Sequence, residues 1–380
     1  MAKIGWKYSA VSDFTKTSAG GTPQKSNKAY YEGGDIPWLL SGEVGTPEIT
    51  QAKNYITVEG LKNSSAKLFP PDSVLVAMYG ATAGEVGILQ FEASTNQAVC
   101  AIFPSDNHVP KFLYYYLLHA KADLVSQAVG NAQPNISQTK IKSLCIPLPP
   151  LEEQRRIVAI LDEAFEGLAR AKENAEVNLQ NARELFESYI DKAFNTAAHE
   201  CQQVTLDTIS ENLDRQRVPI TKKDRQPGDI PYYGASGVVD FVSDHIFDED
   251  LLLVSEDGAN LLARTYPIAF SVSGKSWVNN HAHVLRFEDA ETQEYLRLYL
   301  NSISLEPYVS GMAQPKLNQK ALNRIPIPLP DAASRNSIVR RASNLTSSVE
   351  LLEQKYVETA RDLEDLRQSF LQKAFAGELT

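Results

Sequence analysis

The sequence predicts a mixed α/β (α+β) protein in which two compact domains are separated by two long helices that pair with each other. Three observations carry this prediction: an internal repeat, a heptad pattern after each copy, and short β-rich stretches before it. We expect a first domain over residues 1–150, a long helix over 151–194, a second domain over 195–330 and a second long helix over 331–380.

The repeat joins GNAQPNISQTKIKSLCIPLP at 130–149 to GMAQPKLNQKALNRIPIPLP at 311–330, an offset of 181 residues (311 − 130). Nine of these twenty positions are identical, whereas average residue usage would give about one or two. The same offset aligns residues 188–194 with 369–375. The sequence GDIPW at 34–38 also matches GDIPY at 228–232, now at an offset of 194 (228 − 34). We infer a duplication whose copies differ by insertions and deletions.

A heptad pattern follows each copy of the repeat. Its positions in the first copy are Ile157, Leu161, Ala164, Leu168, Ala171, Ala175, Asn178, Ala182, Leu185 and Tyr189. Adding 181 gives Ile338, Ala342, Leu345, Val349, Leu352, Tyr356, Thr359, Leu363, Leu366 and Phe370. A narrow seam with a period of 3.5 residues fits a single partner helix, so the two helices are expected to pair. The pattern alone leaves their orientation open.

The ends of these helices also carry signals. Pro149 and Pro150 precede the first helix, and Asp331 can cap the second. Asn195 and Gly377 are expected as left-handed stops at the two C-termini.

Before each long helix the chain has the pattern of a compact α/β domain. Strands are expected within 73–80 and 98–104, and helices with aromatic residues over 109–125 and 290–303. The loops of the two domains differ in sequence, which suits two modules of one fold that recognise different ligands.

Composition limits the possible functions. The 380 residues contain no uninterrupted apolar run of about 18 residues, and the first residues lack the apolar core of a signal peptide, so we expect a cytoplasmic protein without a membrane partner. Cys100, Cys145 and Cys201 are far apart and are expected to be buried free thiols.

The net charge of −10 argues against a chain that holds nucleic acid by bulk electrostatics. Basic residues nevertheless cluster locally, and phosphate contact and plain solvation are both open for them. These clusters are Lys16, Lys25 and Lys28 in the first domain, and Arg215, Arg217, Lys222, Lys223 and Arg225 in the second.

No catalytic residue, metal site or cofactor site is predicted. A Ser-Gly-Lys-Ser sequence at 273–276 resembles a phosphate loop, but Ala269 stands where that loop needs glycine. His281 and His283 alternate on an expected strand without a third ligand at a matching spacing, so packing is favoured over metal binding.

Taken together, the chain resembles the specificity (S) subunit of Type I restriction-modification systems. The resemblance rests on IPLPPLEEQRRIVAILDEAF at 146–165, LRQSFLQKAFAGEL at 366–379, Gly-Gly-Thr-Pro at 20–23 and the order of domains and helices. It implies two target-recognition domains that each read one half of a split site in double-stranded DNA, and long helices that form an antiparallel coiled coil.

The resemblance also implies partners. Two methyltransferase (modification) subunits would dock on a non-catalytic chain, and restriction/translocase subunits would join them. S-adenosylmethionine, ATP and Mg would then belong to the partner subunits only. The second half departs from the pattern, because its helix begins PDAASRNSI and its domain lacks a Gly-Gly-Thr-Pro.

Candidate DNA-binding residues are polar or basic side chains of expected loops, where amides and hydroxyls can pair with base edges and lysine with phosphate. In the first domain they are Thr22, Lys25, Ser41, Tyr79, Thr82, Asn96 and Gln97. In the second they are Tyr232, Tyr233, Ser236, Asn260, Lys275, Asn280 and His281. For docking of partner subunits the candidates are Glu152, Glu153, Gln154, Arg155 and Arg156, which we expect on the helix surface off the seam.

Two other functions fit the same sequence. One is the recognition subunit of a related system in which restriction and methylation are fused, and the other is a non-catalytic protein whose helices only space two interaction modules.

Overall fold

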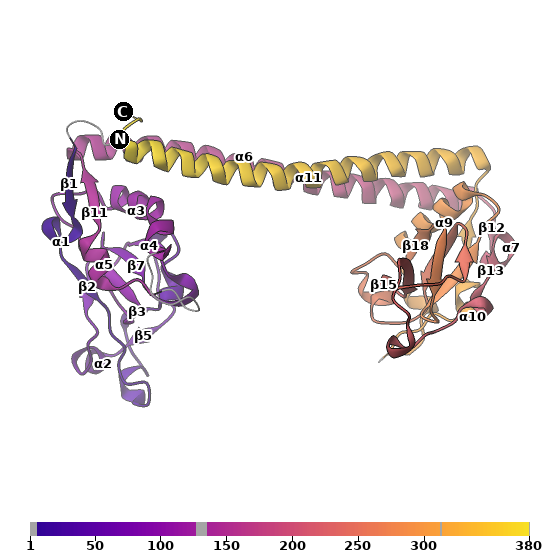
Figure 1. The fold of residues 1–380 in the computed structure, drawn as a ribbon, viewed down its shortest axis with the longest axis horizontal. Coiled ribbons are helices and arrows are strands. Elements are labelled where there is room, and N and C mark those ends of the chain that lie inside the picture. The colour runs from indigo at the N-terminus through magenta and orange to yellow at the C-terminus, as the bar shows by residue number, and fades with distance from the viewer. Residues whose placement is uncertain (1–5, 127–134, 312–313, 380) are drawn as a thin grey trace. The chain divides into compact units, whose positions relative to one another are not determined.

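The computed structural model describes residues 6–126, 135–311 and 314–379. These residues form two compact units, Met1–Asn174 with Glu358–Thr380, and Ala175–Val357. Each unit contains one domain and one part of each long helix, α6 (Leu151–Glu200) and α11 (Ala332–Ala376) (Figure 1).

The first unit is built on a five-stranded sheet of order β2-β10-β7-β8-β4 and a four-stranded sheet of order β5-β3-β9-β6, with the pair β1-β11 beside the helices. Its strands are β1 (Lys7–Ala10), β2 (Thr17–Ala19), β3 (Ile36–Leu39), β4 (Glu48–Ile49), β5 (Tyr55–Ile56), β6 (Leu68–Phe69), β7 (Val74–Ala77), β8 (Val86–Leu89), β9 (Ala93–Thr95), β10 (Val99–Ile102) and β11 (Cys145–Leu148). Its shorter helices and turns are α1 (Val11–Phe14), η1 (Lys28–Tyr30), η2 (Ser41–Glu43), α2 (Val58–Lys62), η3 (Gly80–Thr82), α3 (Pro110–His119), α4 (Lys121–Ser126) and α5 (Gln138–Ser143).

The second unit has two four-stranded sheets, of order β13-β20-β17-β18 and β15-β14-β19-β16, and the pair β12-β21. Its strands are β12 (Gln203–Val204), β13 (Glu211–Asn212), β14 (Ile230–Gly234), β15 (Gly237–Val242), β16 (Phe247–Asp248), β17 (Leu251–Ser255), β18 (Ala269–Val272), β19 (Lys275–Val278), β20 (Ala282–Arg286) and β21 (Ile327–Pro328). Its shorter helices and turns are α7 (Leu206–Ile209), η4 (Asp214–Gln216), η5 (Lys222–Asp224), α8 (Asn260–Ala263), α9 (Ala290–Ser302), η6 (Glu306–Tyr308) and α10 (Gln319–Leu322).

The strand orders confirm the duplication. The order β2-β10-β7-β8 of the first unit returns as β13-β20-β17-β18, and β5-β3-β9-β6 returns as β15-β14-β19-β16. In each second sheet the central pair is parallel, β3 with β9 and β14 with β19. The matching sequences GDIPW and GDIPY supply β3 and β14. The expected strands and aromatic helices are present as β7, β10, α3 with α4, and α9.

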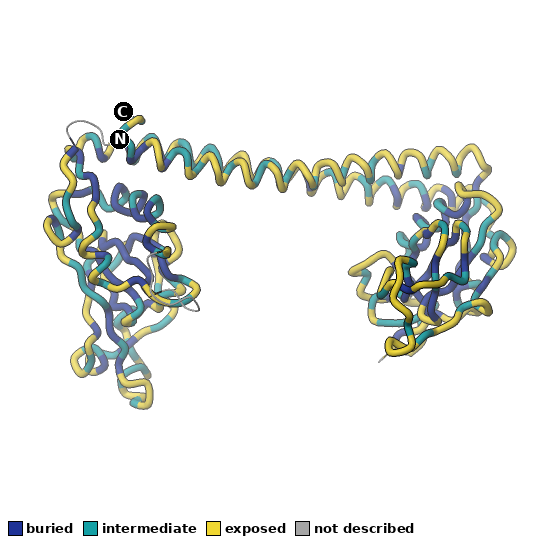
Figure 2. The backbone as a smooth tube through the Cα atoms, viewed as in Figure 1, coloured by how far each residue is buried: buried dark blue, intermediate teal, exposed yellow. Residues whose placement is uncertain are grey.

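The long helices run antiparallel within each unit. In the first unit Ile157 and Leu161 near the start of α6 share a core with Leu371 and Ala374 near the end of α11. In the second, Ile190 and Phe194 near the end of α6 share a core with Ala342 near the start of α11. Buried residues gather where the helices cover the sheets (Figure 2).

The seam is shifted relative to the predicted positions. Leu185 is 60% exposed and Leu366 is 46% exposed, although both were expected in the seam. Leu179 is buried instead, and Phe186 packs on the second core. A strict 3.5-residue repeat drifts by about 20° per heptad against a straight α-helix, so one phase does not hold along the whole helix.

The helix ends agree with the sequence in part. Asp331 caps α11 by accepting a hydrogen bond from the Ser334 backbone N–H at 2.8 Å, and Gly377 takes the left-handed conformation with φ 77°. Asn195 does not stop α6, which continues to Glu200. Additional helical hydrogen bonds and the burial of Ala197 favour this extension.

Two other sequence expectations have outcomes here. Cys100 is buried, but Cys145 is exposed and Cys201 is partly exposed, so the expectation of three buried thiols was wrong for two of them. In the described part of the chain, no helix combines the length and apolar character that a membrane span requires.

Candidate nucleic-acid interface

In each unit one loop connects the first sheet to the second sheet, and the loops of the two units lie at equivalent places. In the first unit the loop between β2 and β3 contains the Gly-Gly-Thr-Pro sequence, and in the second the loop from η4 to β14 covers residues 217–229. Gly20 and Gly21 let the first loop approach its neighbours closely, because a Cβ would lie 2.3 Å from the Thr95 carbonyl oxygen and from the Ala66 nitrogen, respectively. Close packing therefore requires glycine at both positions, because any side chain would clash with neighbouring atoms.

An aromatic residue at the same place in each sheet ties its loop down. Trp38 of β3 donates its indole N–H to the Gly21 carbonyl oxygen at 3.0 Å, and Tyr31 donates its hydroxyl to the Pro23 carbonyl oxygen at 2.5 Å. In the second unit the hydroxyl of Tyr232 accepts a hydrogen bond from the Ile220 backbone N–H at 3.0 Å. Trp277 donates its indole N–H to the Val218 carbonyl oxygen at 2.6 Å.

The structure brings some of the candidate residues of the first unit together. Thr22 donates its hydroxyl to the side-chain oxygen of Gln97, and Thr82 donates to the Tyr79 carbonyl oxygen at 3.3 Å. The side chain of Asn96 accepts the Ala98 backbone N–H at 3.1 Å, so one of its groups is already used.

The other candidates of this unit are spread over its loops. Lys25 is exposed in the glycine loop and Ser41 begins η2. The Asn96 backbone N–H donates to the Leu39 carbonyl oxygen at 2.9 Å, which places the 96–97 turn beside the end of β3.

In the second unit Tyr232 is buried, with 1% of its surface exposed, so its ring supports the loop and is not available to a base. Tyr233 is partly buried and packs against Phe270. Asn260 uses both polar atoms on the backbone of Tyr266, at 2.9 and 3.0 Å. Burial and local hydrogen bonds thus explain these three side chains.

Four candidates of the second unit remain on its surface. Ser236, Lys275 and Asn280 are exposed. His281 is exposed as well, and its Nδ1 lies 2.9 Å from a carboxylate oxygen of Asp257. These side chains come from the turn after β14, the start of β19 and the turn before β20.

Beneath these loops lies a buried charge cluster that the sequence did not reveal. The Nδ1 of His283 lies 2.6 Å from Asp214, and Arg217 donates to Glu256 at 2.7 Å and to the Ala282 carbonyl oxygen at 2.7 Å. Lys316 adds a second contact to Glu256 at 3.1 Å. Burial alone would raise the pKa values of the two carboxyl groups, but hydrogen bonds from His283 to Asp214 and from Arg217 and Lys316 to Glu256 lower both.

This cluster has the donor atoms of a metal site, but its carboxylates are already neutralised by basic side chains. Asp214, Glu256 and His283 each offer an atom within 4.8 Å of the others. The cationic partner is already present, however, because Arg217 bridges both carboxylates and Lys316 contacts one of them. The Nε2 of His283 faces the Leu317 carbonyl oxygen at 2.7 Å, so neither ring nitrogen is left for a metal. The residues fit an ion-pair network.

The candidate docking residues differ in exposure. Glu152, Arg155 and Arg156 are exposed on the first turn of α6. Gln154 is fully buried, so placing it on the docking surface was wrong. Its side chain accepts the Val109 N–H at 2.8 Å and donates to the carbonyl oxygens of Asn107 and Pro149 at 3.1 and 2.9 Å. Glu153 is half-buried.

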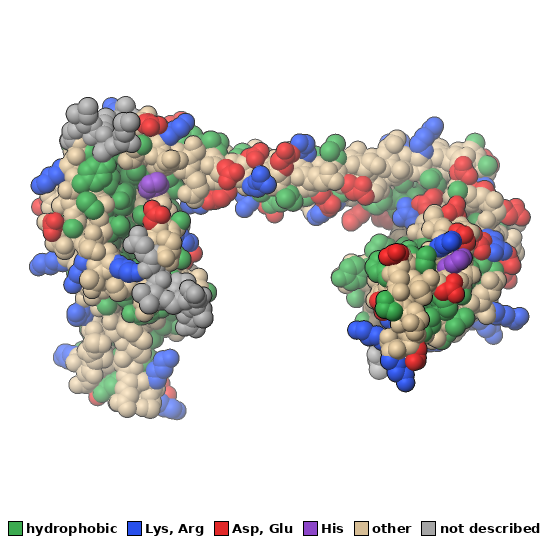
Figure 3. Space-filling model, in the orientation of Figure 1, with side chains coloured by type: hydrophobic (Ala, Val, Ile, Leu, Met, Phe, Trp, Pro, Cys, Tyr) green, Lys and Arg blue, Asp and Glu red, His purple; other side chains and the backbone are tan. Residues whose placement is uncertain are grey.

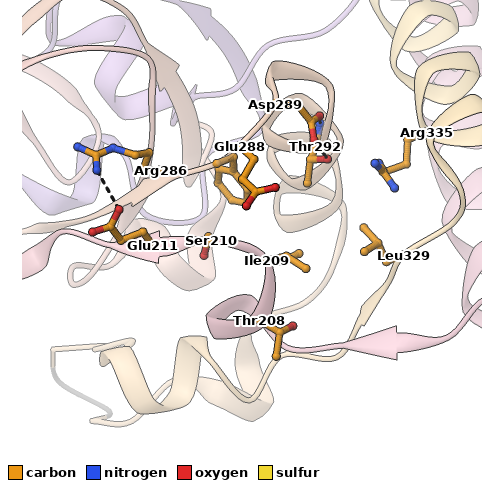
Figure 4. A pocket seen from close by; sticks show the side chains of 11 residues that line it. Thr208, Ile209, Ser210, Glu211, Arg286, Glu288, Asp289, Thr292, Leu329 and Arg335 are labelled. Atoms are coloured by element: carbon orange, nitrogen blue, oxygen red, sulfur yellow. Dashed lines mark hydrogen bonds and ion pairs between the residues drawn. The ribbon is translucent and has the colours of Figure 1, made fainter.

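Arg335 is the repeat counterpart of Gln154 (335 − 154 = 181) and borders a pocket of about 510 Å³. It donates to the Pro330 carbonyl oxygen at 2.8 Å, as Gln154 does to Pro149, but its Nε is buried without a hydrogen-bond partner among the described residues. Figure 4 shows the guanidinium reaching toward Asp289 and Thr292 across the pocket. At this junction the first unit thus has a buried side chain with three hydrogen bonds, and the second unit has one that borders a pocket.

Comparison with known proteins now identifies the class of protein. A family model described as "Type I restriction modification DNA specificity domain" matches residues 3–179 and 199–359. This chain belongs to that family. The two matches cover both domains, in keeping with the duplicated topology.

Individual relatives agree with this family. The chain is 29% identical over 199 residues to the Type I restriction enzyme EcoR124I/EcoR124II specificity subunit of Escherichia coli, a match that spans 49% of each chain. It is 22% identical over 349 residues to the EcoprrI specificity subunit of Escherichia coli, covering 87% of this chain and 86% of the relative. The first of these matches thus spans about half the length of the relative.

Solved structures share the fold. A chain from a structure of a type I R-M system, described for its complex assembly and conformational transition, has a TM-score of 0.76 at 18% identity and is covered to 99%. The HsdS subunit from Thermoanaerobacter tengcongensis has a TM-score of 0.66 at 19% identity and is covered to 98%. At these identities the likeness concerns the fold.

Proposed function

We propose that this chain is the DNA sequence-specificity subunit of a Type I restriction-modification enzyme. One observation carries the proposal: a single module occurs twice with the same strand order, while the loop side chains at equivalent places differ. Base identity is read by a few side chains on loops held by a rigid scaffold. Two such modules suit a DNA site in two halves.

In this proposal the surface candidates contact the DNA, the amide, hydroxyl and imidazole groups at base edges and the lysines at phosphates. They are Thr22, Lys25, Ser41, Tyr79, Thr82, Asn96 and Gln97 in the first unit, and Ser236, Lys275, Asn280 and His281 in the second. Tyr232, Tyr233 and Asn260 act as supports for these loops.

The chain would catalyse no reaction itself. Methyltransferase and restriction/translocase subunits would hold S-adenosylmethionine, ATP and Mg, and would place basic surface around the duplex. This division accounts for a sequence-reading chain with a net charge of −10.

The test is methylome sequencing of a host that expresses the chain with its methyltransferase subunit. The expected result is one methylated motif of two half-sites separated by a fixed spacer. Gln97→Ala should relax one half-site only, and Asn280→Ala the other half only. Lys192→Gln, an exposed change on α6, is the matched control and should leave the motif unchanged.

Loss of both half-sites in either variant that still folds would overturn the assignment of one reader to each half. Absence of any methylated motif with the wild-type complex would overturn the proposed function.

Docking of the methyltransferase is expected at the exposed first turn of α6. Reversing Arg155 and Arg156 to Glu should abolish co-purification of the methyltransferase subunit while the melting temperature stays unchanged. A lowered melting temperature, or unchanged co-purification, would contradict docking at these residues.

A further inference from the structure

The loop over residues 217–225 is held from within by four separate anchors. Arg217 bonds Glu256 and the Ala282 carbonyl oxygen, each at 2.7 Å. Trp277 and Tyr232 bond the backbone of Val218 and Ile220. A loop fixed at this many points loses little conformational entropy when it binds a ligand.

The fourth anchor closes the loop. Arg225 lies over the Tyr232 ring, with its guanidinium carbon 4.3 Å from the ring centroid, and forms an ion pair with Asp240 of β15 at 2.8 Å. Arg225 and Arg217 are therefore both engaged with carboxylates of the unit and serve as structural charges.

The outward part of the loop is different. Thr221, Lys222 and Lys223 are exposed, and η5 presents them on a tight turn. In the described part of the chain neither lysine forms an ion pair, although the Arg225 hydrogen bond, with a smaller contribution from Lys222, lowers the pKa of the Asp240 carboxyl group. Arg215, just before the loop, is exposed as well.

These cations stand out against the charge of their surroundings. Residues 215–225 contain five basic residues, but Arg217 and Arg225 are paired with Glu256 and Asp240. The other three, Arg215, Lys222 and Lys223, together with Asp224 leave a net of +2 (3 − 1), whereas the whole chain carries −10. Figure 3 shows Lys and Arg side chains at the end of the second unit away from its long helices. A polyanion such as DNA is attracted to a local basic surface, even on a chain with a negative net charge.

We propose that the turn over residues 221–225 is a phosphate-contacting loop for duplex DNA, with Lys222 and Lys223 each meeting a backbone phosphate. It is the counterpart of the glycine loop with Lys25 in the first unit, although the second unit lacks the Gly-Gly-Thr-Pro sequence. This inference rests on the proposed function and extends it to the ligand atoms that the loop meets. Tyr232 and Trp277 are positioning residues, because they touch the loop backbone and not the DNA.

The experiment uses the complete complex with its methyltransferase subunits and measures DNA affinity against salt concentration. The duplexes are one with the methylated motif and one of unrelated sequence. The variant Lys222→Gln/Lys223→Gln should weaken binding to both duplexes by a similar factor. It should also make the slope of log affinity against log salt shallower by about 1 to 2, since each phosphate contact contributes roughly 0.9.

Two controls sharpen the result. Lys222→Arg/Lys223→Arg keeps the charges and should retain the wild-type slope. Lys172→Gln/Lys192→Gln removes two exposed charges from α6 and should leave slope and affinity unchanged.

If the Lys222→Gln/Lys223→Gln complex still methylates its motif and shows an unchanged slope, the phosphate contacts of this loop are refuted. The proposed function would then still stand. An altered motif with an unchanged slope would refute these contacts too, because the lysines would then read bases. A wild-type complex without sequence preference would overturn the proposed function and this inference with it.

Discussion

The two units share a strand order but use different chemistry at equivalent places. The first holds the loop between β2 and β3 with glycines in close contact and with indole and phenol hydrogen bonds. The second adds the buried charge cluster of Asp214, Arg217, Glu256 and His283. Where the first unit closes its helix junction with Gln154, the second places Arg335 beside a pocket.

This difference shows what a duplication conserves. Backbone order is fixed by strand pairing and by the apolar core, and both are kept in the two copies. The polar groups that hold the loops have diverged, because each set needs only to satisfy its own backbone and charges. The loops between the sheets can then change without a change of fold.

The largest expected effect comes from the charge cluster of the second unit, which has no counterpart among the described residues of the first. Arg217→Met removes the guanidinium that contacts both Asp214 and Glu256 and leaves them with His283 and Lys316 as partners. Removing one partner of such a buried network costs about 3–5 kcal/mol. Hydrogen exchange should report faster opening of the second unit and little change in the first. Equal loss of protection in both units would show that the cluster does not act within one unit.

The two units should also respond differently to acid. In the first unit burial lowers the pKa of His108 to about 4 from 6.5. The folded state therefore binds fewer protons than the unfolded state between these values, and stability falls as pH drops from about 6.5 to 4, by up to about 3 kcal/mol.

In the second unit the carboxyl groups of Asp214 and Glu256, whose ordinary pKa values are 3.8 and 4.5, have lowered pKa values. Their stabilisation is complete above pH 4.5 and is lost as pH falls through the lower folded values. Hydrogen exchange against pH should show the first unit weakening earlier. His108→Gln should flatten its response between pH 6.5 and 4, and an unchanged response would contradict the role of this histidine.

The helix junctions give the next prediction. Gln154→Ala removes three hydrogen bonds from a buried site and should destabilise the first unit by about 2–3 kcal/mol. Arg335→Gln removes a buried Nε without a partner and should change the second unit by less than about 1 kcal/mol. Thermal unfolding compares the two, and a larger loss for Arg335→Gln would mean that the open pocket is not a weak point.

Much of this fold could be predicted from local patterns. The repeat, the strands β7 and β10 and the helices α3 and α9 follow from periodicity, and Pro149 and Asp331 mark the starts of the long helices. Such signals are local, so a single sequence contains them.

The site could be predicted only in part, because its contacts join distant residues. His283 meets Asp214 across 69 positions, and no spacing in the sequence indicates this pair. Tyr232 and Gln154 have polar side-chain groups, which would favour a place on the surface. Both are buried in the structure, because these groups form hydrogen bonds with the backbone. A signal was available for Gln154, since it lies at the start of the helix, four residues after Pro150 (154 − 150).

The smallest expected effect separates the predicted seam from the observed one. Leu179→Ala removes a buried side chain and should cost about 2 kcal/mol, whereas Leu185→Ala removes one that is 60% exposed and should cost less than about 0.5 kcal/mol. Both lie on α6 within the second unit, so helix propensity and position are matched. Chemical denaturation of the two variants measures the difference. Equal losses of unfolding free energy would support the predicted heptad positions, because Leu185 would then have to be as buried as Leu179.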